Sequence, residues 1–129
     1  MGKVTKRKSL VKKLDDIFSL YIRTRDKFTS VTSGKREDVM DCSHVFSRKN
    51  YSTRWDEENA FCQTKGENIR NNEYIWPYYK WYQDKYGMKQ FEALEKRYNT
   101  VKQFKNYELI ELAQEYKMKL MELEVEDIL

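Results

Sequence analysis

Two short segments, Val39–Phe46 and Ala60–Gln63, are the strand candidates of this chain, and a polar loop of residues 47–59 joins them. Neither segment alternates strictly between apolar and polar side chains, and together they can form only a two-stranded sheet. After Gly66 the pattern of the sequence becomes helical. A hairpin followed by a helix is a ββα unit, so this stretch predicts a small sheet inside a helix-rich α+β fold.

Residues 9–27 predict an amphipathic helix, because apolar residues recur at helical spacing with Lys and Arg between them. These apolar residues are Leu10, Leu14, Ile17, Phe18, Tyr21 and Ile22. Ser9 has a side chain suited to capping the start of such a helix. The preceding residues 1–8 are basic, and we expect them to form a flexible arm. Residues 29–34 are rich in Ser and Thr and predict a turn.

A proline and a glycine mark the first of three helices expected in the C-terminal region, residues 73–129. Pro77 fits the first turn of that helix, and Gly87 fits the position after its last turn. Two further helices are expected near residues 88–98 and 107–126. We therefore expect one domain over residues 1–129, with the ββα core in residues 28–72.

The two outer helices of this region carry side chains that allow two interpretations each. The helix after Pro77 holds aromatic residues that either fill the core or form a stacking platform for nucleobases. They are Trp76, Tyr78, Tyr79, Trp81, Tyr82 and Tyr86. The last helix holds an apolar stripe that either faces the core or forms a dimer interface, and the core is favoured. Its members are Leu109, Leu112, Tyr116, Leu120 and Leu123.

Charge is distributed unevenly along the 129-residue chain, whose formal net charge is +4 at pH 7. The first thirteen residues hold six basic side chains and no acid, whereas seven acids and two lysines follow from Asn106 onward. This asymmetry favours a polyanion on one face, although a solubilising tail has the same composition. No apolar run is long enough to span a bilayer, so no membrane partner is expected. Cys42 and Cys62, with no secretory segment, indicate free thiols in a reducing compartment.

His44 is the only histidine in the chain and the natural candidate for a general base, because imidazole titrates near neutral pH. Hydrolysis of a phosphodiester also needs a cation that stabilises charge on the phosphate and the leaving oxygen. Asp41 and Asn68 offer hard oxygen ligands, which suit Mg²⁺ or Mn²⁺. Asn59 is placed in the sequence to hydrogen-bond the imidazole and orient it.

Basic residues near both ends of the central stretch are candidates for binding the DNA backbone. They are Lys6, Arg7, Lys8, Arg48, Lys49 and Arg54. An ordinary loop remains the alternative for the stretch as a whole. A lone histidine at the end of a strand is often structural, and Asn59 and Asn68 could simply cap the elements that follow them.

The order and spacing of His44, Asn59 and Asn68 resemble the core of an HNH (ββα-metal) nuclease. The longer string resembles the NinG (Rap) family of phage recombination nucleases, from about Tyr21 to the C-terminus. It comprises Asp41-x-x-His44, Arg54-Trp55-Asp56-Glu57-Glu58-Asn59, Gln63, Asn68 and Tyr86-Gly87. The resemblance implies a divalent-metal endonuclease acting on branched or nicked DNA, such as Holliday junctions and D-loops, in the cytoplasm of the bacterial host. A homodimer is attractive, because junction cleavage usually needs two active sites.

The resemblance also assigns roles to individual residues. It implies that His44 is the general base, that Asn59 orients it, and that Asn68 and Asp41 contact Mg²⁺ or Mn²⁺. Many HNH enzymes place a metal-binding Asp directly before the His, where this chain has Ser43. The assignment of Asp41 therefore departs from the common pattern.

The chain also departs from the family at its zinc site. The family has a Cys-x-x-Cys motif before the core and a second one just before the final Asn, and the four thiolates bind a structural zinc. The matching positions here read Ser30-Val31-Thr32-Ser33 and Thr64-Lys65-Gly66-Glu67. Hydroxyl groups are poor zinc ligands, so we expect no structural zinc. Ser30, Ser33, Thr64 and Glu67 are expected to replace it by hydrogen bonds, supported by packing around Phe28, Trp55 and Phe61.

Two other functions fit parts of the sequence. A catalytically inactive DNA-binding or junction-shielding protein on the same fold would use the basic residues and the aromatics equally well. A protein-interaction module built on the acidic last helix explains less of the chain.

Overall fold

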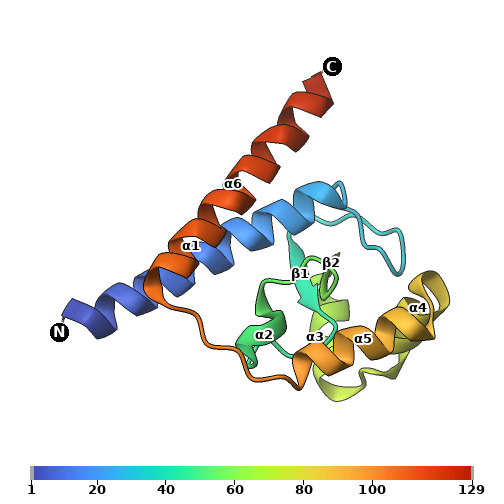
Figure 1. Cartoon of the computed structure of the whole chain (residues 1–129). Helices are drawn as coiled ribbons and strands as arrows, with labels where there is room; N and C mark the ends of the chain where they lie inside the picture. Colours follow the sequence, from blue (N-terminus) through green and yellow to red (C-terminus); the bar gives the residue numbers. More distant parts are fainter. Residues whose placement is uncertain (1, 129) are drawn as a thin grey trace.

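The computed structural model describes residues 2–128, which form six helices and one two-stranded sheet (Figure 1). The elements are α1 (Gly2–Arg25), β1 (Met40–His44), α2 (Tyr51–Arg54), β2 (Ala60–Thr64), α3 (Lys65–Glu73), α4 (Trp76–Tyr86), α5 (Met88–Tyr98) and α6 (Asn106–Ile128). The helix-rich α+β class predicted from the sequence is confirmed. Within these residues no helix is both long enough and apolar enough to cross a membrane.

The strands β1 and β2 pair antiparallel and lead directly into α3, which gives the expected ββα order. Cys42 lies opposite Cys62 in the ladder, and His44 lies opposite Ala60 at its end. One further bond, from the Val45 amide to the Asn59 carbonyl at 2.8 Å, closes the strands around the intervening loop. The hairpin thus places His44 where the sheet ends and the loop begins.

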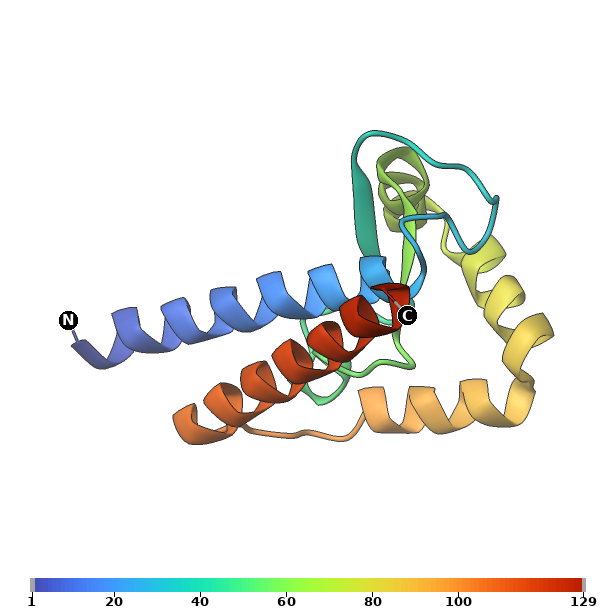
Figure 2. The same ribbon diagram turned by 90° about the horizontal axis from the view of Figure 1, so that it is seen from above.

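The long helices α1 and α6 pack against each other, and α1 also packs against the sheet (Figures 1 and 2). Apolar side chains of these elements form one core cluster. It comprises Leu14, Phe18, Tyr21, Ile22, Trp55, Ala60, Leu109, Tyr116 and Leu120. The interpretation of the last helix as core-facing is therefore confirmed. Leu109, Tyr116 and Leu120 of the predicted stripe are buried within the chain.

A second cluster lies between the sheet and the corner formed by α4 and α5 (Figure 2). Its buried members are Val45, Phe46, Phe61, Tyr78, Tyr82, Phe91 and Leu94. Gly87 links the two helices with φ of 94°, a left-handed conformation that favours glycine. This agrees with the position after the last helical turn that the sequence predicts for it.

The expectation of a flexible basic arm in residues 1–8 is wrong for the part that the structure describes, because α1 begins at Gly2. Ser9 lies inside the helix and does not cap it. The reason is a tertiary contact. The guanidinium of Arg7 donates to the Phe104 carbonyl at 2.8 Å and to Asn106 Oδ1 at 2.9 Å, which ties the start of α1 to the start of α6.

The two turns that carry cysteines in the resembling family are joined here by hydrogen bonds, as the sequence predicts. Ser30 Oγ donates to Glu67 Oε1 at 2.7 Å, and the Thr64 amide donates to the same oxygen at 2.8 Å. The Glu67 amide donates in turn to Thr64 Oγ1 at 3.2 Å, which completes a capping box at the start of α3. Ser33 contributes its amide to Ser30 Oγ at 3.2 Å.

The packing expected around these turns is only partly as predicted. Trp55 and Phe61 are buried, at 4% and 5% exposure, but Phe28 is 42% exposed. Phe28 has φ of 50°, and its ring faces the Arg23 guanidinium 5.8 Å away instead of the core. A sharp turn after α1 therefore directs this side chain outward, and the prediction for Phe28 is wrong.

Substitution Glu67→Gln tests the hydrogen bonds between the two turns. Burial would raise the pKa of Glu67, but hydrogen bonds from Ser33, Thr64 and Ser30 outweigh it and lower the pKa to about 2. The carboxylate therefore contributes stability above its unfolded pKa of 4.5, and the contribution is lost as the pH falls toward 2. After a discount for partial exposure, we expect the variant to lose about 1–2 kcal/mol of unfolding free energy at pH 7.

Urea unfolding at pH 7 and pH 3 measures this loss, with Glu73→Gln on the same helix as the control. A loss that is the same at both pH values would contradict the role of the charged carboxylate.

Elemental analysis of the same protein should find no stoichiometric zinc.

Candidate active site

His44 is held by a single hydrogen bond that fixes its tautomer. Its Nε2 lies 2.9 Å from the backbone carbonyl oxygen of Arg54. A carbonyl can only accept, so Nε2 carries the proton and Nδ1 is left with a free lone pair. Burial lowers the pKa of His44 to about 4, with the Arg54 carbonyl acting in the opposite direction. The imidazole is therefore neutral at pH 7 and can accept a proton at Nδ1.

Asn59 does not bond the imidazole directly, and the expectation that it does is wrong. The side chain is fully buried, and its Nδ2 donates to the carbonyls of Phe46 at 2.9 Å and Thr53 at 3.0 Å. Its Oδ1 accepts from the Phe46 amide at 2.8 Å. Asn59 therefore joins the two ends of the loop, and it fixes the backbone next to the Arg54 carbonyl that holds His44.

Arg54 is committed to the interior of the protein, so the expectation that it binds phosphate is also wrong. Its Nε and Nη2 donate to the two carboxylate oxygens of Asp15 at 3.0 and 2.6 Å. Its Nη1 donates to the Arg48 carbonyl at 3.1 Å. All three guanidinium nitrogens are thus engaged, and the side chain anchors the loop to α1.

Asp15 is a supporting residue that the sequence reasoning missed. Besides Arg54, its carboxylate accepts from Trp55 Nε1 at 2.9 Å. Burial would raise the pKa of Asp15, but the hydrogen bonds from Arg54 and Trp55 outweigh it and lower the pKa. An acid that follows the basic first half of α1 was the only signal available in the sequence, and it does not reveal the partners.

Asp41 and Asn68 lie together, as their proposed shared role requires. Asn68 Nδ2 donates to Asp41 Oδ2 at 3.1 Å, and Ser43 Oγ donates to Asn68 Oδ1 at 2.9 Å. Ser43 is fully buried and also accepts from Asn71 Nδ2 at 3.1 Å. The serine that precedes His44 thus orients the asparagines of α3.

A cavity of about 550 Å³ lies over these residues. Its polar lining side chains are Cys42, His44, Ser47, Arg48, Asn68, Asn71 and Asn72. Asp41 is not among the lining residues, so the structure places it beside Asn68 and outside the cavity wall. Ile75 and Tyr79 complete an apolar part of the wall.

The possible metal ligands around the cavity suit a cation that binds together with a substrate phosphate. They suit a permanently bound metal ion less well. Within residues 2–128, no three His, Cys, Asp or Glu side chains lie close enough to hold a metal ion. Mg²⁺ often takes one or two carboxylates and completes its shell with water and substrate phosphates. Asn68 Oδ1 and the neighbouring Asp41 could supply that small protein share. Burial raises the pKa of Cys42 to about 12, so its thiol stays protonated and is a poor zinc ligand.

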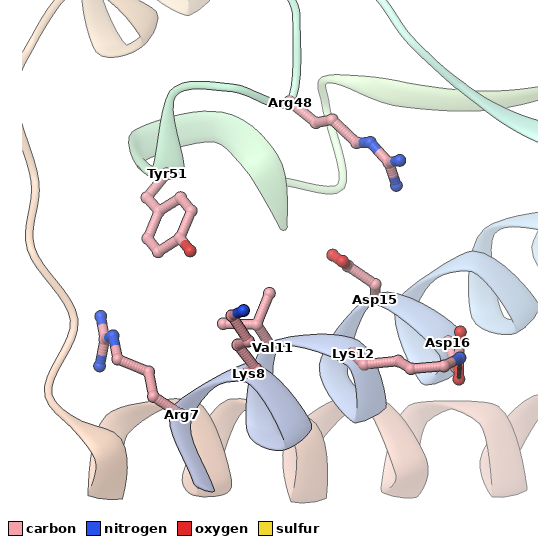
Figure 3. A pocket seen from close by; sticks show the side chains of 8 residues that line it. All are labelled: Arg7, Lys8, Val11, Lys12, Asp15, Asp16, Arg48 and Tyr51. Atoms are coloured by element: carbon pink, nitrogen blue, oxygen red, sulfur yellow. Dashed lines mark hydrogen bonds and ion pairs between the residues drawn. The ribbon is translucent and has the colours of Figure 1, made fainter. Parts of the chain in front are cut away.

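A second cavity, of about 540 Å³, lies between α1 and the loop after β1 (Figure 3). Its lining residues are Arg7, Lys8, Val11, Lys12, Asp15, Asp16, Arg48 and Tyr51. Arg48 lines both cavities, so this basic groove and the cavity around His44 share one lining residue.

The structure therefore gathers some of the six predicted DNA-binding residues and separates others. Arg7, Lys8 and Arg48 meet in the basic groove, although Arg7 is also bonded to the chain before α6. Lys49 lines a smaller neighbouring cavity together with Lys102, which sequence reasoning missed. Lys6 is exposed on α1 and lines none of these three cavities.

The single histidine permits a direct test of its environment. We expect the pKa of His44 to lie well below 6.5, with the proton on Nε2 at neutral pH. The unfolded chain binds a proton at this imidazole at a higher pH than the folded chain does. The free energy of unfolding should therefore fall by about 2 kcal/mol as the pH falls from 7 to 5. An NMR titration of the imidazole measures the pKa without ambiguity, and the urea-unfolded chain is the control. A folded pKa near 6.5 would contradict the buried hydrogen-bonded ring.

Comparison with known proteins gives one family. The family described as Bacteriophage Lambda NinG protein matches residues 1–126 of the chain. No curated protein and no solved structure matches the chain. The match spans nearly the whole chain and includes His44, Asn59 and Asn68. The family resemblance suggested by the sequence is confirmed, and the chain belongs to the bacteriophage lambda NinG protein family.

Proposed function

We propose that the chain is a metal-dependent HNH-type DNA endonuclease that cuts branched or nicked recombination intermediates in the cytoplasm of a phage-infected bacterium. One observation carries the proposal. The neutral His44 has its Nε2 fixed on the Arg54 carbonyl and its Nδ1 free, and it lines a cavity shared with Asn68. Phosphodiester hydrolysis requires a general base in a fixed tautomer, next to oxygen atoms that can bind a metal ion.

In this mechanism His44 Nδ1 takes a proton from the water that attacks the phosphorus, and the bond to the leaving oxygen breaks. Asn59 and the Arg54 side chain do not contact the imidazole. They hold in place the Arg54 carbonyl, which orients the ring. A Mg²⁺ or Mn²⁺ ion held by Asn68, Asp41 and the phosphate would stabilise the negative charge that develops on the phosphate and the leaving oxygen. Arg48 is placed to hold the adjoining phosphate, because it lines both the cavity and the groove.

The basic groove supplies a path for the rest of the DNA strand. Lys8, Lys12 and Arg48 line it from two sides, and Lys8 and Arg48 are exposed. Asp15 does not oppose DNA strongly, because its charge is paired with Arg54 at 2.6 Å. A strand that follows the groove leads to His44 through Arg48, so binding and chemistry share one surface.

A catalytically inactive junction-binding protein is the second candidate, and one observation favours it. No carboxylate lines the cavity around His44 among residues 2–128. Such a protein would bind DNA through the same groove and leave it uncut. In the proposed nuclease, two active sites for opposing strands would come from a homodimer, and light scattering would measure the oligomeric state.

Cleavage should depend on both a divalent metal and His44. We expect a labelled four-way junction or Y-fork to be cut with Mg²⁺ or Mn²⁺, and to stay intact with EDTA. His44→Ala should reduce the rate by at least a hundredfold, because general-base catalysis contributes about 10²–10⁴. Lys80→Ala, on the exposed face of α4, is the control. Binding without cleavage in every metal would favour the inactive protein.

The groove can be tested separately through the salt dependence of binding. Each phosphate contact that is removed should flatten the slope of log K against log salt by about 1. We expect Lys8→Ala and Arg48→Ala to do this, and Lys80→Ala to leave the slope unchanged. Equal slopes for all these proteins, measured by fluorescence anisotropy on one duplex, would place the DNA elsewhere.

A further inference from the structure

The structure separates the aromatic residues of α4 into two groups. Tyr78 and Tyr82 are buried, at 1% and 0% exposure, so the core interpretation is correct for them. Trp76 is 63% exposed, and Tyr74 just before it is 58% exposed. Tyr74 and Trp76 flank Ile75 in the chain, where α3 ends and α4 begins. They are large, apolar and unused by the core.

This corner adjoins the cavity of the proposed active site. Ile75 and Tyr79 line that cavity, and the Trp76 ring contacts Tyr79 edge to face, with ring centroids 5.9 Å apart. α3, which ends at Glu73 with Tyr74 as its C-cap, carries Asn68 and Asn71 on the cavity wall. The exposed aromatics thus lie next to the cavity, since both are chain neighbours of Ile75 and Trp76 also contacts Tyr79.

Packing within the chain does not account for the exposed pair. Trp76 makes one aromatic contact within residues 2–128, and neither the Trp76 indole nor the Tyr74 hydroxyl has a hydrogen-bond partner there. Both rings are therefore available for a contact with something outside the chain.

We propose that Trp76 and Tyr74 form a stacking platform for an unpaired nucleobase beside the phosphate that is cut. The inference rests on the proposed nuclease and specifies its substrate as DNA with an unstacked base at the cleavage point. Bases inside a duplex have no free face, whereas a base at a branch, flap or nick can lie on an aromatic ring. The cavity then has a basic wall for phosphates at Arg48 and an aromatic wall for a base.

The size of the platform favours a base over a protein partner. Two aromatic side chains match the faces of one or two bases. A stable protein interface buries roughly 800 Å² on each partner, about two to three times the area that one tryptophan and one tyrosine offer. Arg70, four residues before Tyr74, is also exposed and suits a nucleic acid.

The platform can be tested by binding, with cleavage prevented by His44→Ala in Mg²⁺. The probes are a Y-fork with 2-aminopurine as the first unpaired base, and a fully paired duplex of the same length. Trp76→Ala should weaken binding of the fork by roughly 5- to 100-fold, since stacking contributes that much per base. The duplex should change by less than about twofold, and Trp76→Phe should keep most of the affinity. Phe28→Ala removes an exposed aromatic that lines neither cavity, and it is the matched control.

The readouts separate this inference from the proposed function. Stacking should quench 2-aminopurine in the fork complex, and Trp76→Ala should restore its fluorescence. Unchanged fork affinity and fluorescence in Trp76→Ala would overturn the platform, even if the protein with His44 cuts DNA. An equal loss on fork and duplex would overturn it as well. A Trp76-dependent preference for the fork, without cleavage by the protein with His44, would support the platform and contradict the nuclease.

Discussion

The hydrogen bond between His44 Nε2 and the Arg54 carbonyl is the contact on which the candidate site depends. It selects the tautomer, and it leaves Nδ1 as the only ring nitrogen that can take a proton. The carbonyl is fixed from both sides, because Asn59 bonds the preceding Thr53 carbonyl and Asp15 binds the Arg54 side chain. The proposed catalytic base is therefore oriented by a backbone carbonyl at the end of α2.

That loop in turn depends on the helices at the ends of the chain. Asp15 belongs to α1, and α1 is held against α6 by the shared core and by the Arg7 bonds to Phe104 and Asn106. On the other side, α3 is joined to the turn after α1 through Ser30 and Glu67. Hydrogen bonds across these two turns stabilise less than a bound zinc would. The packing of α1 and α6 therefore carries more of the task of holding the hairpin in place.

Features set by local pattern could be predicted from the sequence, and features set by distant partners could not. The helices and the hairpin follow from spacing and residue type. The bond between Ser30 and Glu67, which lie 37 residues apart, was expected only because the family resemblance matches their two turns. Arg54 was misjudged because its charge is visible in the sequence, whereas Asp15, its partner, lies 39 residues away. The start of α1 was misplaced for the same reason, since Arg7 bonds residues at the other end of the chain.

Among residues 2–128 no carboxylate lines the cavity around His44, which bears on how the proposed reaction would be controlled. The lining amides and imidazole would hold a divalent cation weakly, and Asp41 lies outside the wall, so the phosphate would contribute a large share of the binding. Arg48 lines both the cavity and the groove, where it could bring that phosphate to Asn68. Metal, phosphate and base would then assemble only when DNA occupies both cavities. An enzyme organised in this way would be inactive until the strand is correctly placed, which limits cutting of DNA that merely touches the basic groove.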